Sequence, residues 1–267
     1  MFNEYLKAEL TQKAVKYGQK LTGNDSYRHP SVEPLSSVIY SQLEYNFHPE
    51  AFKNITAKKE FEKRFDKFHT NFNPDLKIKE LQSSNSSDAL AMNIFGHPLI
   101  TKWKGIRDLL KVDHKAPLDI SFGVHPGVKW MGKEDSTEVD IVINNIFCEC
   151  KLTEGDFTHK NKEHVERYDL FAEVFHSDML IQDDKYYYNY QLIRNILAAA
   201  ENNYRFILFC DTRRPDLAKS FYQTIRCIKD NYLSLRMNCE IIYWQEIPLY
   251  AGKDLTEFLK DKYGIGQ

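Results

Sequence analysis

The chain has 267 residues, of which 42% are hydrophobic and 28% charged, which suits one globular domain with additions or with a small helical extension. Its formal net charge of -2 excludes a globally basic signature, although a basic cleft balanced by acids elsewhere would remain compatible with a nucleic-acid partner. No stretch approaches the roughly 20 apolar residues of a membrane span, and the N-terminus lacks a signal-peptide pattern. We therefore expect a soluble cytoplasmic protein without a membrane partner.

The first 75 residues have a mainly helical pattern, and we place a domain boundary there: an N-terminal helical region over 1–75 and a core over 76–267. Within EFEKRFDKFHTNF, phenylalanines recur at helical spacing with charges between them. This predicts an amphipathic helix that ends near Asn73 and Pro74. The stripe is formed by Phe61, Phe65, Phe68 and Phe72. Core packing explains it better than base stacking.

A second helix is expected in LQSSNSSDALAMNIFGHP, where serines stand before an apolar run. Ser86 or Ser87 is the candidate N-cap, and Gly96-His97-Pro98 ends the helix.

From about residue 118 the pattern becomes strand-like. LDISFGVHPGVKW, EVDIVINNIFCECKL, RFILFCDT and CEIIYW predict strands, and helices are expected around 163–176, 189–202 and 215–230. This order indicates an α/β fold with a mixed central sheet flanked by helices.

Cysteine and histidine usage gives little sign of metal binding. The five cysteines include no C-x-x-C pair and lie mostly in apolar runs, so buried free thiols are expected. The nine histidines show no ligand spacing: His159 and His164 stand in a charged stretch that should face solvent.

One segment, EVDIVINNIFCECKL, predicts a hairpin whose two faces differ. Asn144 and Asn145 tolerate the positive φ of a two-residue type I′ turn. The resulting register pairs Ile143 with Ile146, Val142 with Phe147, Ile141 with Cys148, Asp140 with Glu149 and Glu138 with Lys151. One face then holds only apolar side chains and should be buried, namely Val139, Ile141, Ile143, Ile146, Cys148 and Cys150.

The other face of this hairpin concentrates charge. Asp140 and Glu149 would face each other about 5 Å apart, where like charges destabilise a sheet. A shared Mg²⁺ would compensate, since this ion prefers carboxylate oxygens and keeps positions for water and phosphate. Lys151 on the same face could then activate water or stabilise phosphate charge. The alternative is a solvated face with a Glu138–Lys151 ion pair.

These residues resemble the PD-(D/E)xK, or restriction-endonuclease-like, nuclease superfamily: Val139-Asp140, then Glu149-Cys150-Lys151, with Val139 in place of the proline. The resemblance implies that Asp140 and Glu149 bind Mg²⁺, with Mn²⁺ as a substitute. It further implies the Cys150 backbone carbonyl as a third ligand and Lys151 as the catalytic lysine. The implied fold is a four- or five-stranded mixed sheet flanked by helices.

Further stretches between residues 80 and 210 resemble a bacterial subgroup of proteins predicted to be restriction endonucleases. SSDALAMNIFG is similar to its helix before the sheet, and QLIRNILAAA to its helix after the catalytic strand. Gln191, Arg194 and Asn195 share one face of the second helix. We expect Gln191 to be catalytic and Arg194 and Asn195 to contact phosphate, the alternative being a polar face in solvent.

Other residues remain open candidates. The superfamily often adds an acidic ligand from its first core helix, for which Asp88 is the nearer candidate and Glu44 the more distant one; each is otherwise a cap or surface acid. Basic residues flanking the site could contact DNA, or could simply be solvated. These are Lys160, Lys162, Arg213 and Arg214. The tyrosines of DKYYYNY suit packing better than stacking on unpaired bases.

The function implied by the resemblance is that of a magnesium-dependent endonuclease that hydrolyses DNA phosphodiester bonds, as a type II-like restriction endonuclease does. Repair, junction-resolving and non-specific defence nucleases share the same hairpin, and a non-catalytic nucleic-acid-binding protein is the rival from another class. Restriction enzymes that cut both strands commonly act as dimers, so a homodimer through the N-terminal helices is one further expectation.

Overall fold

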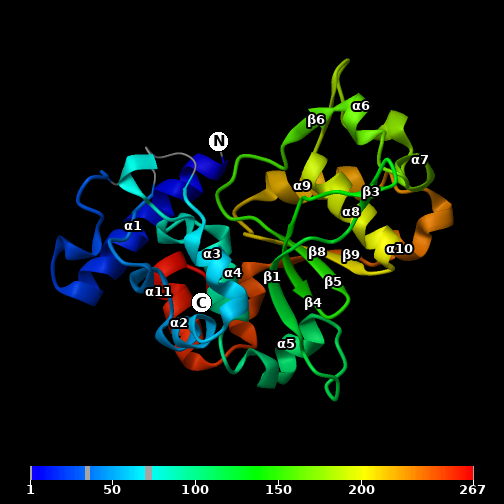
Figure 1. Ribbon diagram of the computed structural model, residues 1–267. Coiled ribbons are helices and arrows are strands. Elements are labelled where there is room, and N and C mark those ends of the chain that lie inside the picture. Colours follow the sequence, from blue (N-terminus) through cyan, green and yellow to red (C-terminus); the bar gives the residue numbers. More distant parts are fainter. Residues whose placement is uncertain (1, 34–36, 70–73, 267) are drawn as a thin grey trace. The chain divides into compact units, whose positions relative to one another are not determined.

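The computed structural model describes residues 2–33, 37–69 and 74–266. Two compact units make up the chain: Met1–Leu118 with Tyr243–Gln267, called the first unit, and Asp119–Ile242, called the second (Figure 1). The division differs from the boundary at residue 75 suggested by the sequence, because residues 76–118 and the C-terminal segment group with the N-terminal helices.

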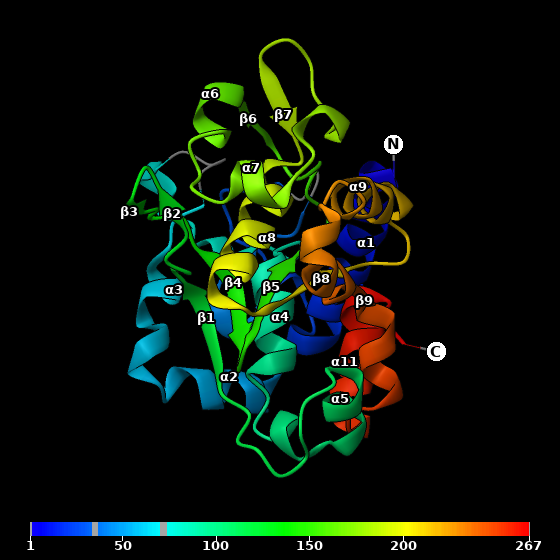
Figure 2. The ribbon, with the colours of Figure 1, turned by 90° about the vertical axis from the view of Figure 1, so that its right-hand side faces the viewer.

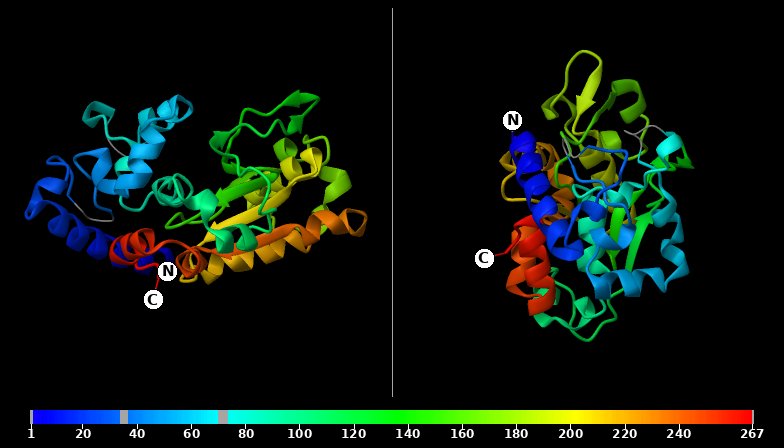
Figure 3. Two further views of the ribbon diagram at one scale, coloured as in Figure 1. Left: turned by 90° about the horizontal axis from the view of Figure 1, so that it is seen from below. Right: turned by 90° about the vertical axis from the view of Figure 1, so that its left-hand side faces the viewer.

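The first unit is helical. Its α-helices are α1 (Phe2–Thr22), α2 (Pro49–Thr56), α3 (Glu62–Asp66), α4 (Ser87–Phe95), α5 (Lys104–Leu109) and α11 (Lys253–Tyr263). Short 3-10 turns join them: Asp25–Tyr27, Leu43–Asn46, Lys59–Phe61, Pro74–Leu76, Glu80–Gln82, Ile100–Lys102 and Trp244–Leu249. The first and last helices lie side by side (Figure 3), with the rings of Tyr17 and Phe258 edge to face at 5.7 Å. The N-terminal and C-terminal segments therefore share one core.

The long amphipathic helix predicted around Phe61 is wrong in extent. Helix α3 ends at Asp66, and Lys67 has extended backbone. The chain then pairs with residues 78–80, since His69 N donates to Ile78 O and Glu80 N to Lys67 O, both at 2.9 Å. Phe61 is buried whereas Phe68 is 53% exposed. Tertiary pairing therefore interrupts the helical spacing after one turn, and Phe72 lies outside the described residues.

The predicted start of α4 is confirmed. Ser86 is its N-cap, and the side chain accepts a hydrogen bond from Ala89 N at 3.1 Å. Gly96 is the C-cap residue. A side chain on Gly96 would meet Met92 O and Ile55, so glycine permits this close packing.

The second unit is built on a five-stranded sheet in the order β1-β4-β5-β8-β9. Strands β1, β4 and β5 pair antiparallel and β5 pairs parallel with β8, which confirms the mixed α/β sheet. The strands are β1 (Ile120–Val124), β4 (Val139–Ile143), β5 (Ile146–Cys150), β8 (Arg205–Cys210) and β9 (Cys239–Tyr243). Strand β5 is therefore central, with a partner on each side.

The helices of this unit follow the strands. They are α6 (Lys162–Val165), α7 (Phe171–Val174), α8 (Tyr190–Asn202), α9 (Pro215–Ile225) and α10 (Leu233–Met237), with 3-10 turns at Ser177–Met179 and Asp230–Tyr232. The helix expected over 163–176 is instead two short ones. Between them Tyr168 forms an isolated β-bridge with Trp130, which the helical pattern did not reveal.

The second unit also contains two small two-stranded ribbons. One pairs β2 (Lys129–Trp130) with β3 (Lys133–Glu134), and the other pairs β6 (His159–Asn161) with β7 (Tyr186–Tyr188). The second ribbon belongs to the long excursion between β5 and α8 (Figure 2). Tyr186 and Tyr188 are exposed, whereas Tyr187 and Tyr190 are buried, so packing holds for only half of this tyrosine group.

The hairpin joining β4 to β5 has the predicted register near its turn. Ile143 pairs with Ile146, Val142 with Phe147 and Ile141 with Cys148. Asn144 has a positive φ of 51° but Asn145 does not, so the turn is not type I′, which requires both. The Asn144 side chain instead accepts a hydrogen bond from Asp119 N at 2.8 Å, which anchors the turn to the start of β1.

Both faces of β5 are buried. The predicted apolar face is confirmed, since its six side chains are at most 1% exposed. On the other face, Phe147 pairs in parallel with Phe206 of β8, so both side chains point the same way. Phe206 stacks on Phe221 of α9 at 6.2 Å, and Asn195 of α8 bonds to Glu149. Helices α8 and α9 therefore cover the face that carries Glu149.

Candidate active site

Asp140 lies at the end of the β4–β5 ladder. Its Oδ2 accepts a 2.7 Å hydrogen bond from the backbone N of Cys150. The last paired positions are Ile141 and Cys148, so the predicted pairs of Asp140 with Glu149 and of Glu138 with Lys151 are not among those formed. The carboxylate replaces a backbone partner at this point and ties the end of β5 to β4.

Glu149 is a buried carboxylate, and one of its oxygen atoms accepts a short hydrogen bond. Its side chain is 2% exposed, and Oε2 accepts a 2.6 Å hydrogen bond from Asn195 Nδ2. Its other oxygen, Oε1, lies 2.9 Å from Lys151 Nζ but accepts no well-aligned hydrogen bond from the described residues. This face of the sheet is consequently not the solvated surface of the alternative interpretation.

Lys151 is held as an ammonium. It is 5% exposed, and Nζ donates to Gln191 Oε1 at 3.0 Å. Burial lowers its pKa, but the charges of Glu149 and Glu154, followed by that of Asp140, raise the pKa more, so the net pKa lies above its usual value. The Lys151 side chain is therefore a positively charged hydrogen-bond donor when no metal ion or substrate is bound.

Helix α8 supplies the amides of the site. Its first turn places Gln191 over Lys151, and Asn195 follows one turn later over Glu149, so the predicted i, i+4 face is the one that meets β5. Arg194 is 6% exposed and donates from Nε and Nη2 to Asn195 Oδ1, at 3.1 and 2.9 Å. Its Nη2 also donates to Glu138 O at 3.0 Å. These bonds favour a positioning role over a direct phosphate contact for Arg194.

Arg214 organises the loop that follows Lys151. It is fully buried, and Nη1 and Nη2 donate to Glu154 O at 2.7 Å and Gly155 O at 3.1 Å. Its guanidinium also pairs with Asp216 at 2.7 Å. Arg213 is partly exposed and pairs with Asp211 at 2.6 Å. Burial makes Arg214 a structural clamp, and of the two arginines only Arg213 offers surface for DNA.

A tyrosine network next to this site was not expected from the sequence. Tyr168 Oη donates to Asp135 and lies 2.7 Å from Tyr190 Oη. Burial, followed by the hydrogen bond to Asp135, raises the pKa of Tyr168, so this phenol stays neutral. Tyr190 is the first residue of α8 and directly precedes Gln191. The network therefore anchors the start of the helix that supplies both amides.

The remaining candidate ligands are Cys150, Asp88 and Glu44. Cys150 Sγ lies on the apolar face, and the Cys150 carbonyl remains a predicted third ligand. Asp88 belongs to the first unit and forms a 3.1 Å ion pair with Arg64, while Glu44 is exposed in a 3-10 turn of that unit. Both remain predictions.

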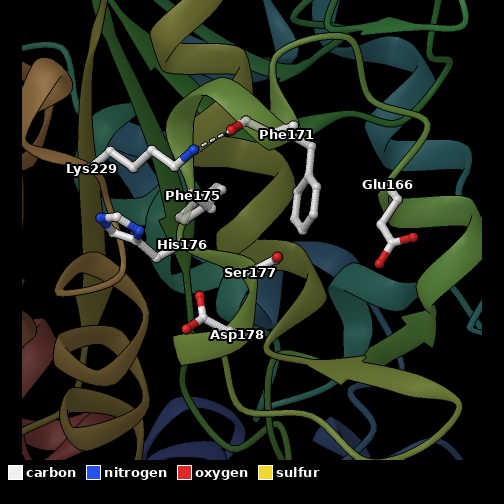
Figure 4. Close-up of a pocket in the computed structure, with 8 residues that line it drawn as sticks. Glu166, Phe171, Phe175, His176, Ser177, Asp178 and Lys229 are labelled. Atoms are coloured by element: carbon white, nitrogen blue, oxygen red, sulfur yellow. Dashed lines mark hydrogen bonds between the residues drawn. The ribbon is translucent and has the colours of Figure 1, made fainter.

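One open pocket of about 430 Å³ lies between the excursion before α8 and the segment after α9 (Figure 4). It is lined by Glu166, Phe171, Ala172, Phe175, His176, Ser177, Asp178 and Lys229. Lys229 Nζ donates to Ala172 O at 2.6 Å across it. None of the hairpin carboxylates lines this pocket, so it is separate from the site of Glu149 and Lys151.

Comparison with known protein families assigns the chain to one of them. The family described as Restriction Endonuclease associating with ARP matches residues 7–264. The chain belongs to this restriction endonuclease family, which supports a nuclease role in a restriction system, with DNA as the substrate that such a family implies. Comparisons with curated proteins and with solved structures gave no significant match. Among the described helices, none has the length and apolar character needed to cross a membrane.

Proposed function

We propose that this chain is a magnesium-dependent endonuclease that hydrolyses DNA phosphodiester bonds as a type II-like restriction enzyme, with its active site at Asp140, Glu149 and Lys151. The observation that carries the proposal is the buried pair of Glu149 and Lys151, 2.9 Å apart and bonded to α8 at both ends. Burying two opposite charges generally costs more than a well-packed apolar pair. Such a cluster is therefore typical of a functional site.

The donor atoms of this cluster fit Mg²⁺. Glu149 Oε1 is buried without a well-aligned hydrogen bond from the described residues, and the Asp140 carboxylate lies at the adjacent end of β4. Both offer the hard oxygen atoms that Mg²⁺ prefers, and the Cys150 carbonyl would be a third ligand. Mn²⁺ accepts the same ligands and is the expected substitute. When bound, the ion would polarise the phosphate and lower the pKa of a water molecule.

The protein groups around these carboxylates have separate roles in the proposed reaction. Lys151 presents its ammonium to the negative charge that develops on the phosphate. Gln191 fixes the direction of that ammonium through its 3.0 Å bond to Nζ. Asn195, itself oriented by Arg194, holds the Glu149 carboxylate in one rotamer. Preorganisation of this kind contributes to the rate because no rearrangement is needed during the reaction.

Incubation of the full chain with plasmid DNA and Mg²⁺ tests this function. Wild type should give discrete fragments, Lys151→Ala none, and Lys253→Ala, which removes an 89% exposed lysine, should behave as wild type. Smeared or nicked products would instead indicate a non-specific nuclease. Absence of cleavage with Mg²⁺ and with Mn²⁺ over varied DNA sequences would contradict the proposal. Light scattering of the same samples would measure whether the active species is the homodimer that two-strand cleavage favours.

A further inference from the structure

Three side chains from distant parts of the first unit converge on one point. His48 is the N-cap residue of α2, His97 follows the C-cap of α4, and Asp254 lies in the first turn of α11. Asp254 Oδ2 is 3.5 Å from His97 Nε2 and 3.9 Å from His48 Nε2. One nitrogen or oxygen atom of each residue lies within 4.8 Å of those of the other two. No local spacing in the sequence shows this arrangement, which only the fold assembles.

Burial at this point leaves one polar atom unsatisfied. His97 is 1% exposed, and its Nε2 lies 3.5 Å from Asp254 Oδ2 but has no well-aligned hydrogen-bond partner among the described residues. Buried polar atoms without partners are rare in folded proteins and call for a specific explanation. His48 is also buried, whereas the Asp254 side chain is 53% exposed. The cluster therefore has a buried nitrogen-rich side and a side open to water.

Aromatic rings hold both imidazoles in place. Trp103 stacks on His97 with ring centroids 5.0 Å apart, and Phe258 meets His48 edge-on at 5.4 Å. The two imidazole rings are themselves 5.1 Å apart. This packing restricts ring rotation, so the direction of each Nε2 is fixed before any ligand arrives.

We propose that His48, His97 and Asp254 form a binding site for a transition-metal dication such as Zn²⁺, with water completing the coordination. Two imidazole nitrogens and a carboxylate oxygen are a ligand set that suits Zn²⁺. Bond lengths of about 2.0–2.1 Å put tetrahedral ligand atoms about 3.4 Å apart, close to the separations from Asp254 observed here. The bound ion would link α2, α4 and α11, and would differ in chemistry from the oxygen-rich site of Glu149.

The histidine tautomers define what binding requires. His48 Nδ1 accepts a hydrogen bond from Glu50 N, and His97 Nδ1 accepts one from Leu99 N, both at 3.2 Å. A neutral imidazole that accepts at Nδ1 carries its proton on Nε2. Metal binding at Nε2 moves that proton to Nδ1, where it faces the backbone N–H of Glu50 or Leu99, so both long hydrogen bonds are lost. The site is therefore weaker than one in which Nδ1 donates to a carbonyl oxygen.

The test is calorimetric titration of the chelator-treated full chain with Zn²⁺, in excess Mg²⁺ so that the oxygen-rich site is saturated. Wild type should bind one Zn²⁺ and gain thermal stability. His97→Asn keeps an acceptor for Leu99 N but loses Nε2, and Asp254→Asn changes a half-exposed residue with little risk to folding. Each should weaken Zn²⁺ binding by about tenfold or more.

The controls separate this site from other zinc ligands. His114→Asn changes an exposed histidine of the same unit, and Glu149→Gln changes the proposed nuclease site; both should bind Zn²⁺ as wild type does. No binding by wild type, or unchanged binding by His97→Asn and Asp254→Asn, would overturn the proposal. Loss of binding in Glu149→Gln alone would place the zinc at the other site and overturn it as well.

Discussion

Asn195 Nδ2 donates a 2.6 Å hydrogen bond to Glu149 Oε2, and this contact joins helix α8 to the central strand β5. The same Asn195 accepts two hydrogen bonds from Arg194 through Oδ1. The fully buried Asn195 amide therefore donates to the Glu149 carboxylate and accepts from the Arg194 guanidinium. Its orientation is fixed by the chemistry on its two sides, which a carboxylate in its place could not satisfy.

We expect Asn195→Ala to lower both stability and cleavage. The change leaves the Glu149 carboxylate and the Arg194 guanidinium short of a partner, so unfolding in urea should show a loss of about 1–3 kcal/mol. Asn54→Ala, which removes a 2.7 Å bond to Gly96 O in the first unit, is the matched control. It should lose stability but keep its cleavage rate. Equal cleavage by both variants would contradict the role of Asn195.

The neighbouring arginines Arg214 and Arg213 should respond differently to alanine. Arg214 is fully buried and bonds to the loop after Lys151, so Arg214→Ala should cost roughly 3 kcal/mol or more in denaturant unfolding. Arg213 is partly exposed, but its partner Asp211 is fully buried, so Arg213→Ala should cost a smaller amount of about 1–3 kcal/mol. If Arg213→Ala proved as destabilising as Arg214→Ala, the clamp would be assigned to the wrong residue.

Removing a tyrosine hydroxyl should lower stability more at the buried Tyr168 than at the exposed Tyr188. Tyr168→Phe removes the hydroxyl between Asp135 and Tyr190, which leaves a part-buried carboxylate short of a donor and should cost about 1–3 kcal/mol. Tyr188→Phe removes an exposed hydroxyl bonded to Asp183 at 2.8 Å and should change stability by less than about 0.5 kcal/mol. Thermal melts of the two variants measure the difference. Equal melting temperatures would show that the network does not stabilise α8.

Magnesium itself should stabilise the folded chain if the proposed ligands are correct. A ligand that binds only the folded state raises the melting temperature as its concentration increases. Wild type should therefore melt higher in Mg²⁺ than in a chelator, and Asp140→Asn should show a smaller rise. Titration with NaCl to the same ionic strength would separate site binding from general screening of charge. An identical rise in wild type and Asp140→Asn would remove this carboxylate from the ligand set.

The β4–β5 hairpin shows which structural features the local sequence pattern can predict. Alternation of apolar residues over 139–150 correctly predicted which face of β4 and β5 is buried and the register near the turn. It did not predict that the opposite face would also be buried. Helices α8 and α9 cover that face, and they begin more than 35 residues after β5 ends, so only the assembled fold places them there.

Where the sequence misled, a distant partner prevailed over a local signal. The phenylalanine spacing from Phe61 favoured a long helix, but pairing between 67–69 and 78–80 ends α3 at Asp66. The histidines showed no ligand spacing, yet His48 and His97 meet Asp254 in space. Arg194 and Arg214 were predicted to contact phosphate or DNA because their charge can be read from the sequence, whereas their burial cannot.

The most direct test of the central claim is the single-turnover rate of DNA cleavage in Mg²⁺ for wild type and Lys151→Met. Methionine fills the space of the lysine stem but carries no charge, so the variant should fold. Circular dichroism of the same sample verifies that it does. If Lys151 stabilises charge at the phosphate, the rate should fall by about 100-fold or more while DNA binding persists. A folded Lys151→Met protein that cleaves DNA at the wild-type rate would contradict the assignment of this site.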